Sequence, residues 1–164
     1  GHSAGGATAE QAMAEDGRLA AGINMDGSLG YMPDHLLPVA LEGLDRPFML
    51  LNAGYNEQGV DSHLTAKDRG LFWERSNGWK FDLCIPHGAH FSFIDHQFIL
   101  PELSNRLSLS SRVLEASVGT ADPEEVLEAQ REYVTAFFDL HLKQIRQPLL
   151  ELEASPYTVA EVIR

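Results

Sequence analysis

The chain has 164 residues, of which 44% are hydrophobic and 22% charged, a size and composition typical of one globular domain with a sizeable core. Its formal net charge of −12 argues against nucleic acid or an anionic membrane surface as a partner, because phosphate binding requires clustered Lys and Arg. No apolar run reaches the ~18 residues of a transmembrane segment. Secreted and cytoplasmic locations both stay open, since a signal peptide would lie upstream of residue 1.

The first half of the sequence predicts one helix and two strands. Residues 4–15 (AGGATAEQAMAE) are small and rich in helix formers, which indicates a helix. Residues 18–25 (RLAAGINM) predict a short buried strand that ends at the turn signal Asp26-Gly27. A loop rich in Gly and Pro follows, and residues 47–53 (PFMLLNA) predict a second strand.

The second half predicts a helix, a third strand and a longer helix. Asp61-Ser62 can cap a helix that runs to about Ser76. Residues 79–85 (WKFDLCI) predict a buried strand, which is followed by the histidine-rich loop PHGAHFSFIDH. Residues 122–125 (DPEE) place an N-cap Asp, a first-turn Pro and two acids at the start of a helix that ends near Lys143.

These elements together predict an α/β fold. Strands that are apolar on both faces and alternate with helices indicate a mostly parallel sheet covered by helices on both sides. Ligands of such sheets bind at the carboxyl ends of the strands. Asp26 follows the first predicted strand, and His87 and His90 follow the third. We therefore expect these side chains to share one edge of the sheet. The single Cys84 lies within the third strand, where a lone thiol behaves as a small hydrophobe.

The first five residues, GHSAG, fit the G-x-S-x-G pattern of a nucleophile elbow. In such an elbow a serine occupies a strained turn between a strand and a helix, so a side chain two positions to either side would clash. The helix that follows would point its amino end at the site, and the N–H of Ala4 would serve as an oxyanion-hole donor. Gly6 would allow close packing of that helix. The pattern alone is short, and a Gly-rich helix start explains it equally well.

A serine nucleophile needs a histidine base, and a carboxylate must orient that base. Four of the seven histidines are poorly placed. We expect His2 to point away from the site, His63 and His141 to lie in helices, and His35 to lie in a loop that follows no strand. Of the other three, two directly follow the third strand, where α/β hydrolases, in the chain order Ser, acid, His, require the base. They are His87 and His90.

Four segments in this order carry a resemblance to a known family: GHSAGGATA, GINMDG, PFMLLNAGYN and HGAHFSFIDH. They resemble the platelet-activating-factor acetylhydrolase group of α/β hydrolases from residue 1 to about residue 143. The resemblance implies an α/β-hydrolase fold and a serine esterase with Ser3 as nucleophile, Asp26 as orienting acid and His90 as base. It also implies short or oxidised acyl esters, those of phospholipids included, as substrates, and no cofactor.

Other assignments stay open beside this one. Asp26 is also an ordinary residue for an Asp-Gly turn, and Glu57, after the second strand, lies where many α/β hydrolases keep their acid. The spacing His87-x-x-His90, with Asp95 and His96 nearby, could instead hold a metal ion in a metal-dependent hydrolase, although a helical H-E-x-x-H context is missing.

The resemblance also predicts how the chain is organised. Residues 1–146 would form the C-terminal part of a hydrolase domain, and residues 147–164 would form a C-terminal tail. We expect the upstream strands and the loop that gives the second oxyanion donor to lie outside this chain, so that the N-terminal half of the domain is its expected partner. The alternative is an inactive fragment or subunit. Ala4 departs from the bulky aromatic residue that the family commonly carries there.

Overall fold

The computed structural model describes residues 1–32 and 35–164. The helices are α1 (Ala4–Glu15), α2 (Pro38–Glu42), α3 (Lys67–Arg75), α4 (His96–Leu107), α5 (Ser111–Val118) and α6 (Pro123–Lys143), with 3-10 turns η1 (His90–Phe93) and η2 (Pro148–Glu151). The strands are β1 (Gly22–Met25), β2 (Gly30–Met32), β3 (His35–Leu36), β4 (Phe48–Ala53), β5 (Tyr55–Asn56), β6 (Gly59–Val60), β7 (Lys80–Ile85) and β8 (Glu161–Ile163).

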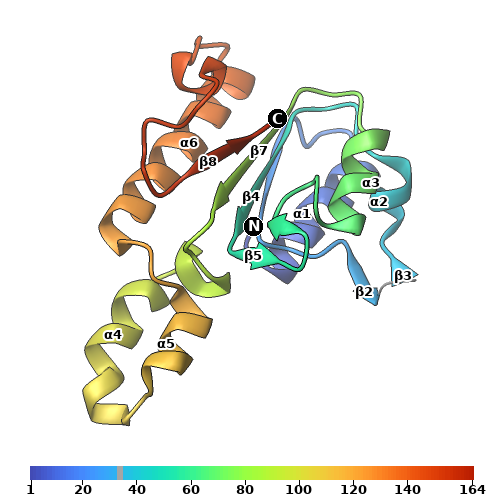
Figure 1. Ribbon diagram of the computed structural model, residues 1–164. Coiled ribbons are helices and arrows are strands. Elements are labelled where there is room, and N and C mark those ends of the chain that lie inside the picture. The colour runs from blue at the N-terminus through green and yellow to red at the C-terminus, as the bar shows by residue number, and fades with distance from the viewer. Residues whose placement is uncertain (33–34) are drawn as a thin grey trace.

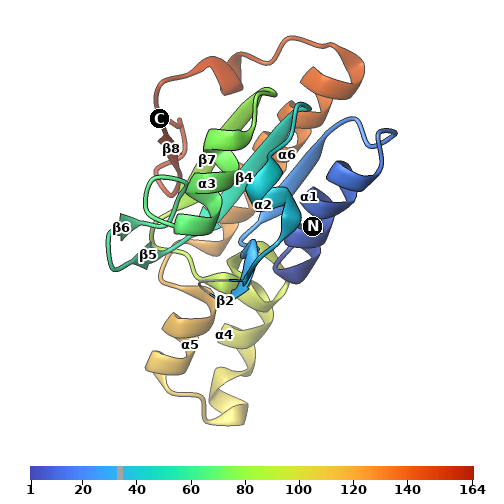
Figure 2. The same ribbon diagram turned by 90° about the vertical axis from the view of Figure 1, so that its right-hand side faces the viewer.

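A four-stranded sheet with the order β1-β4-β7-β8 forms the centre of the molecule. β1, β4 and β7 run parallel, and β8 pairs antiparallel with β7. Helices α1, α2 and α3 cover one face of this sheet and α6 covers the other (Figures 1 and 2). The predicted α/β class with a mostly parallel, doubly covered sheet is therefore confirmed.

The middle strand β4 explains why the sheet is covered on both faces. Its side chains alternate between the two sides, as the period of a strand requires. Phe48 and Leu50 belong to the core under α1–α3, whereas Met49 and Leu51 belong to the core under α6. All four side chains are fully buried. A strand that is apolar on both faces needs an apolar layer on each side, and here helices supply both layers.

The helix expected over residues 61–76 begins later, at Lys67. Residues 61–65 form turns, so His63 lies before the helix and not within it. The reason is local: the hydroxyls of Ser62 and Thr65 both donate to the carbonyl oxygen of Val60. Such bonds between side chain and backbone compete with helix formation. Strand β1 is likewise shorter than predicted and begins at Gly22.

The loop expected after Asp26-Gly27 contains β2, β3 and α2, and its residues 33–34 lie outside the described part of the chain. The sequence indicated a histidine-rich loop over residues 86–96 and no element over residues 97–121. In the structure this stretch between β7 and α6 contains the pair α4 and α5, which projects beyond the carboxyl ends of the strands (Figure 1). The N-cap expected at Asp122 is confirmed, since its carboxylate accepts from the N–H groups of Glu124 and Glu125. No helix in residues 1–32 and 35–164 is long and apolar enough to cross a membrane.

The expected tail, residues 147–164, is partly integrated into the fold. It forms η2 and then β8, whose Val162 pairs with Leu83 in β7. Leu150, Val162 and Ile163 are buried and two of them pack in the core under α6. A strand of only three residues has too little periodicity to be predicted from its sequence.

Val162 and Glu161 provide a matched test of this edge strand. Val162→Ala removes buried apolar area and should lower the free energy of unfolding by about 1–2 kcal/mol. Glu161→Ala, at the exposed neighbouring position of the same strand, should change it by less than about 0.5 kcal/mol. Chemical denaturation of the two variants measures the difference. Equal effects would mean that β8 does not contribute to the core.

Candidate active site

Ser3 lies at the N-cap of α1 in the left-handed region of backbone space, with φ 56° and ψ −130°. Two backbone hydrogen bonds hold this turn against β1. The Ser3 N–H donates to the Met25 carbonyl at 2.8 Å, and the Met25 N–H donates to the Gly1 carbonyl at 2.9 Å. Non-glycine residues adopt such a conformation only where the surroundings impose it. The geometry is that of the strained elbow expected from the motif.

The glycines around Ser3 have different roles. A Cβ at Gly1 would collide with the carbonyl of Gly5, and a Cβ at Gly6 would collide with the side chain of Asn24. A Cβ at Gly5 would meet no atom of the described chain within 4 Å. The expectation that both positions two away from Ser3 exclude a side chain is therefore right for Gly1 and wrong for Gly5. Close packing of α1 on β1 depends on Gly6 instead.

Asp26, which follows β1, also has a positive φ, at 54°. Its N–H donates to the carbonyl of Leu51 in β4, and its Oδ1 accepts from the N–H of Ala53 at 3.2 Å. Asn24 fixes the next residue from both sides, because its Oδ1 accepts from the Gly27 N–H and its Nδ2 donates to the Gly27 carbonyl. The backbone is thus fixed by hydrogen bonds both at Asp26 and at the next residue, Gly27.

His90 comes from the loop after β7 and begins η1. Ser92 anchors this loop, because its hydroxyl accepts from the Ala89 N–H at 2.9 Å and donates to the Val118 carbonyl at 2.8 Å. The His87 carbonyl accepts from the N–H groups of Thr120 and Ala121. These bonds tie the loop to the segment between α5 and α6.

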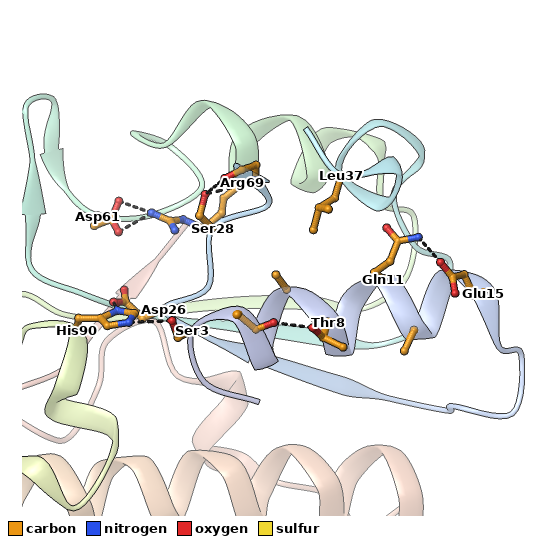
Figure 3. Close-up of a pocket in the computed structure, with 14 residues that line it drawn as sticks. Ser3, Thr8, Gln11, Glu15, Asp26, Ser28, Leu37, Asp61, Arg69 and His90 are labelled. Carbon is orange, nitrogen blue, oxygen red and sulfur yellow. Dashed lines mark hydrogen bonds and ion pairs between the residues drawn. The ribbon is translucent and has the colours of Figure 1, made fainter. Parts of the chain in front are cut away.

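The structure brings Ser3, Asp26 and His90 together (Figure 3). His90 Nε2 lies 2.9 Å from Ser3 Oγ, and His90 Nδ1 lies 2.6 Å from Asp26 Oδ2. A carboxylate accepts only, so Nδ1 carries the proton and Nε2 is free to accept from the serine hydroxyl. Asp26 is largely buried, whereas the His90 ring is 38% exposed. This is the geometry in which a histidine can deprotonate a serine.

The rival residues lie elsewhere. Glu57 is exposed at the turn between β5 and β6, and the exposed His87 is near Tyr55, with ring centroids 6.1 Å apart. His63, expected in a helix, is buried and bonds Asp82 through Nδ1 at 2.7 Å. The alternative metal site of His87, His90, Asp95 and His96 has no support. Within the described residues, no three or more His, Cys, Asp or Glu side chains are arranged so that they could hold a metal ion.

A cavity of about 590 Å³ opens beside Ser3 and His90. It follows α1 and is lined there by small or polar side chains (Figure 3). On its opposite wall the guanidinium of Arg69 pairs with the carboxylate of Asp61. The N–H of Ala4 at the first turn of α1 makes no hydrogen bond to any described residue, so it is available to an oxygen atom bound next to Ser3.

Comparison with protein families matches residues 1–151 to the family described as "Platelet-activating factor acetylhydrolase, isoform II". The chain belongs to this family. A probable 1-alkyl-2-acetylglycerophosphocholine esterase of Arthroderma benhamiae is 30% identical, over 96% of this chain and 40% of that protein. The resemblance stated from the sequence is confirmed.

A solved esterase structure also matches the fold of this chain. The ferulic acid esterase from Streptomyces cinnamoneus matches with a TM-score of 0.79 and 30% identity, over 100% of this chain and 45% of that chain. The fold is therefore part of the α/β-hydrolase fold. This member of the acetylhydrolase family spans 40% and 45% of the lengths of the two relatives.

Two residues with a place in this arrangement were not anticipated from the sequence: one contacts His90, and the other contacts Asn24, which holds the turn after Asp26. His2 does not point away, since its Nε2 lies 2.6 Å from the backbone carbonyl oxygen of His90. Glu10 is fully buried on α1, and its Oε2 accepts from the same Asn24 amide that holds Gly27. Glu10 could have been found from helical spacing, because it shares the buried face of α1 with Gly6 and Met13.

Burial raises the pKa of Glu10 from 4.5 to about 8, although the Asn24 hydrogen bond and the charge of Arg69 oppose this rise. Between these two values the folded chain binds a proton that the unfolded chain has lost. Its contribution to stability is therefore complete below pH 4.5 and declines as the pH rises towards 8.

Glu10→Gln removes this dependence while keeping the shape of the side chain. We expect the melting temperature of the variant, relative to the parent chain, to increase progressively from pH 5 to pH 8. The matched control is Glu15→Gln, which removes one charge from the exposed end of the same helix. Thermal unfolding at several pH values measures both. A difference between Glu10→Gln and parent that does not vary with pH would contradict the prediction.

Proposed function

We propose that the chain carries the catalytic residues of a carboxylic ester hydrolase that works through an acyl-enzyme. Ser3 Oγ attacks the ester carbonyl carbon while His90 Nε2 takes the hydroxyl proton, and Asp26 steadies the resulting imidazolium. The tetrahedral intermediate then breaks its bond to the alcohol oxygen, which receives the proton from His90. Water repeats the sequence on the acyl-enzyme and releases the acid. No cofactor enters these steps.

The observation that carries the proposal is the double hydrogen bonding of His90, to Ser3 at 2.9 Å and to Asp26 at 2.6 Å. Three residues from separate turns meet with the hydrogen-bond order and the histidine tautomer that acyl transfer requires. The strained Ser3 backbone supports the same role, because such strain persists mainly at functional sites.

Stabilisation of the oxyanion is assigned to the Ala4 N–H at the amino end of α1. One such donor contributes roughly 10²–10³-fold in rate. A second donor commonly comes from a loop upstream of the elbow in α/β hydrolases. We propose that the N-terminal half of the hydrolase domain supplies this donor and is the partner of the chain described here.

The substrate we propose is a small or lipid carboxylic ester with a short acyl group. The two relatives are named as esterases of an acetylglycerophosphocholine and of ferulic acid, so the acyl groups in their names differ. An acetyl ester such as p-nitrophenyl acetate has the smallest common acyl group and is the first substrate to assay.

A fluorophosphonate tests the proposal directly, because it phosphonylates only an activated serine. Intact mass should increase by one adduct, and peptide mapping should place that adduct on Ser3. Ser3→Ala should remove the adduct, and His90→Ala should slow its formation roughly 10²–10⁴-fold. His87→Ala, at an exposed position of the same loop, should leave the rate within about twofold. Absence of an adduct on the folded parent chain would overturn the proposal.

The acid is tested by a second matched pair. Asp26→Asn keeps the size of the side chain but removes the charge that holds the His90 tautomer, so labelling should slow by roughly 10²–10⁴-fold. Glu57→Gln, on the exposed turn, should label at the parent rate. If Glu57→Gln were the slower variant, the assignment of the acid to Asp26 would be wrong.

A further inference from the structure

His2 lies next to His90, the proposed base. It precedes Ser3 and forms a parallel bridge with Met25, so its backbone is part of the sheet edge. Its ring packs on the His90 ring with centroids 4.7 Å apart, and on Phe91 and Phe93 at 6.4 and 6.3 Å. Two neighbouring residues of the elbow thus contact His90 at two different points.

The hydrogen bond between His2 and His90 has a defined direction. A backbone carbonyl oxygen can only accept, so His2 Nε2 must carry a hydrogen and donate it over the 2.6 Å distance. Ser3 contacts the Nε2 of the His90 ring, whereas His2 contacts the peptide to which that ring is attached. The two contacts restrain both the ring and its backbone.

His2 is not in a position to touch a substrate. It is half-buried and is absent from the residues that line the cavity beside Ser3 and His90. Its effect on the reaction must therefore act through His90. In enzymes, displacement of a reacting group by about 1 Å can reduce the rate on the order of 10²-fold.

We infer that His2 is a positioning residue, which holds the His90 backbone through its Nε2–H and thereby keeps the base in register with Ser3. The inference rests on the proposed function for its kinetic consequence. Its structural part, the restraint on the His90 loop, does not depend on that function.

Two substitutions separate the hydrogen bond from the packing of the ring. His2→Phe keeps an aromatic ring against His90 but has no donor. His2→Gln loses the ring but can place an amide N–H close to the position of the imidazole Nε2–H. If donation to the His90 carbonyl matters, His2→Phe should be impaired and His2→Gln should be largely rescued.

The kinetic test measures ester hydrolysis and fluorophosphonate labelling. For His2→Phe we expect kcat and the labelling rate to fall roughly 10–100-fold, with KM within about twofold of the parent value. His2→Gln should stay within about fivefold of the parent in kcat. Equal losses in both variants, in proportion to a lowered melting temperature, would indicate a merely structural role and overturn the inference. So would parent-like kinetics for His2→Phe.

A second measurement keeps the inference testable if the parent chain shows no activity. Amide hydrogen exchange of residues 88–94 should accelerate in His2→Phe and stay near the parent rate in His2→Gln, while exchange in β4 is unchanged in both. Unchanged exchange of residues 88–94 in His2→Phe would overturn the inference. Absence of a Ser3 adduct in the parent, with accelerated exchange in His2→Phe, would overturn the proposed function alone.

Discussion

The site depends on two residues with side chains that are held in left-handed backbone conformations. Ser3 and Asp26 have φ values of 56° and 54°, and each conformation costs on the order of 1–3 kcal/mol. Parallel strands bring the two turns side by side: Ser3 bonds Met25 at the end of β1, and Asp26 bonds Leu51 in β4. Each turn directs its side chain out of the strand edge and towards His90. Without this pair of strained turns, the serine and the carboxylate would not reach opposite nitrogens of one imidazole.

A buried polar network keeps these turns in place. Asn24 lies under Gly6 and bonds both backbone groups of Gly27, while its amide also donates to Glu10 on α1. The helix that begins at Ser3 and the turn that contains Asp26 are therefore connected through one side chain. Burial of a carboxyl group such as Glu10 is unfavourable when it is ionised. The network thus trades stability for a defined position, a common property of functional sites.

Local patterns in the sequence were sufficient for α1, β4, β7 and α6, because each has a clear cap, composition or apolar run. They failed where a contact distant in sequence, or a local bond between a side chain and the backbone, decides the structure. β8 exists because β7 offers a free edge, and residues 61–65 form turns because Ser62 and Thr65 bond the backbone. Motif and chain order indicated the segments that hold Ser3, Asp26 and His90, but they left Glu57 and His87 open, and only the family resemblance favoured Asp26 and His90 over them. The orientation of His2 was not, since it follows from the path of the His90 loop, which no pattern at residues 1–5 encodes.

The first turn of α1 shows how few residues such a site needs. At Ser3 the chain leaves the sheet edge and begins the helix, and this abrupt change of direction sends three consecutive groups to three different places. The His2 ring lies under the His90 peptide, the Ser3 hydroxyl meets the His90 ring, and the Ala4 N–H opens at the helix terminus beside the cavity. An extended strand would alternate these side chains across the sheet, and a helix would spread them around its axis. Only the residue with positive φ between the two elements lets adjacent positions contact one histidine, His90, at its backbone and at its ring.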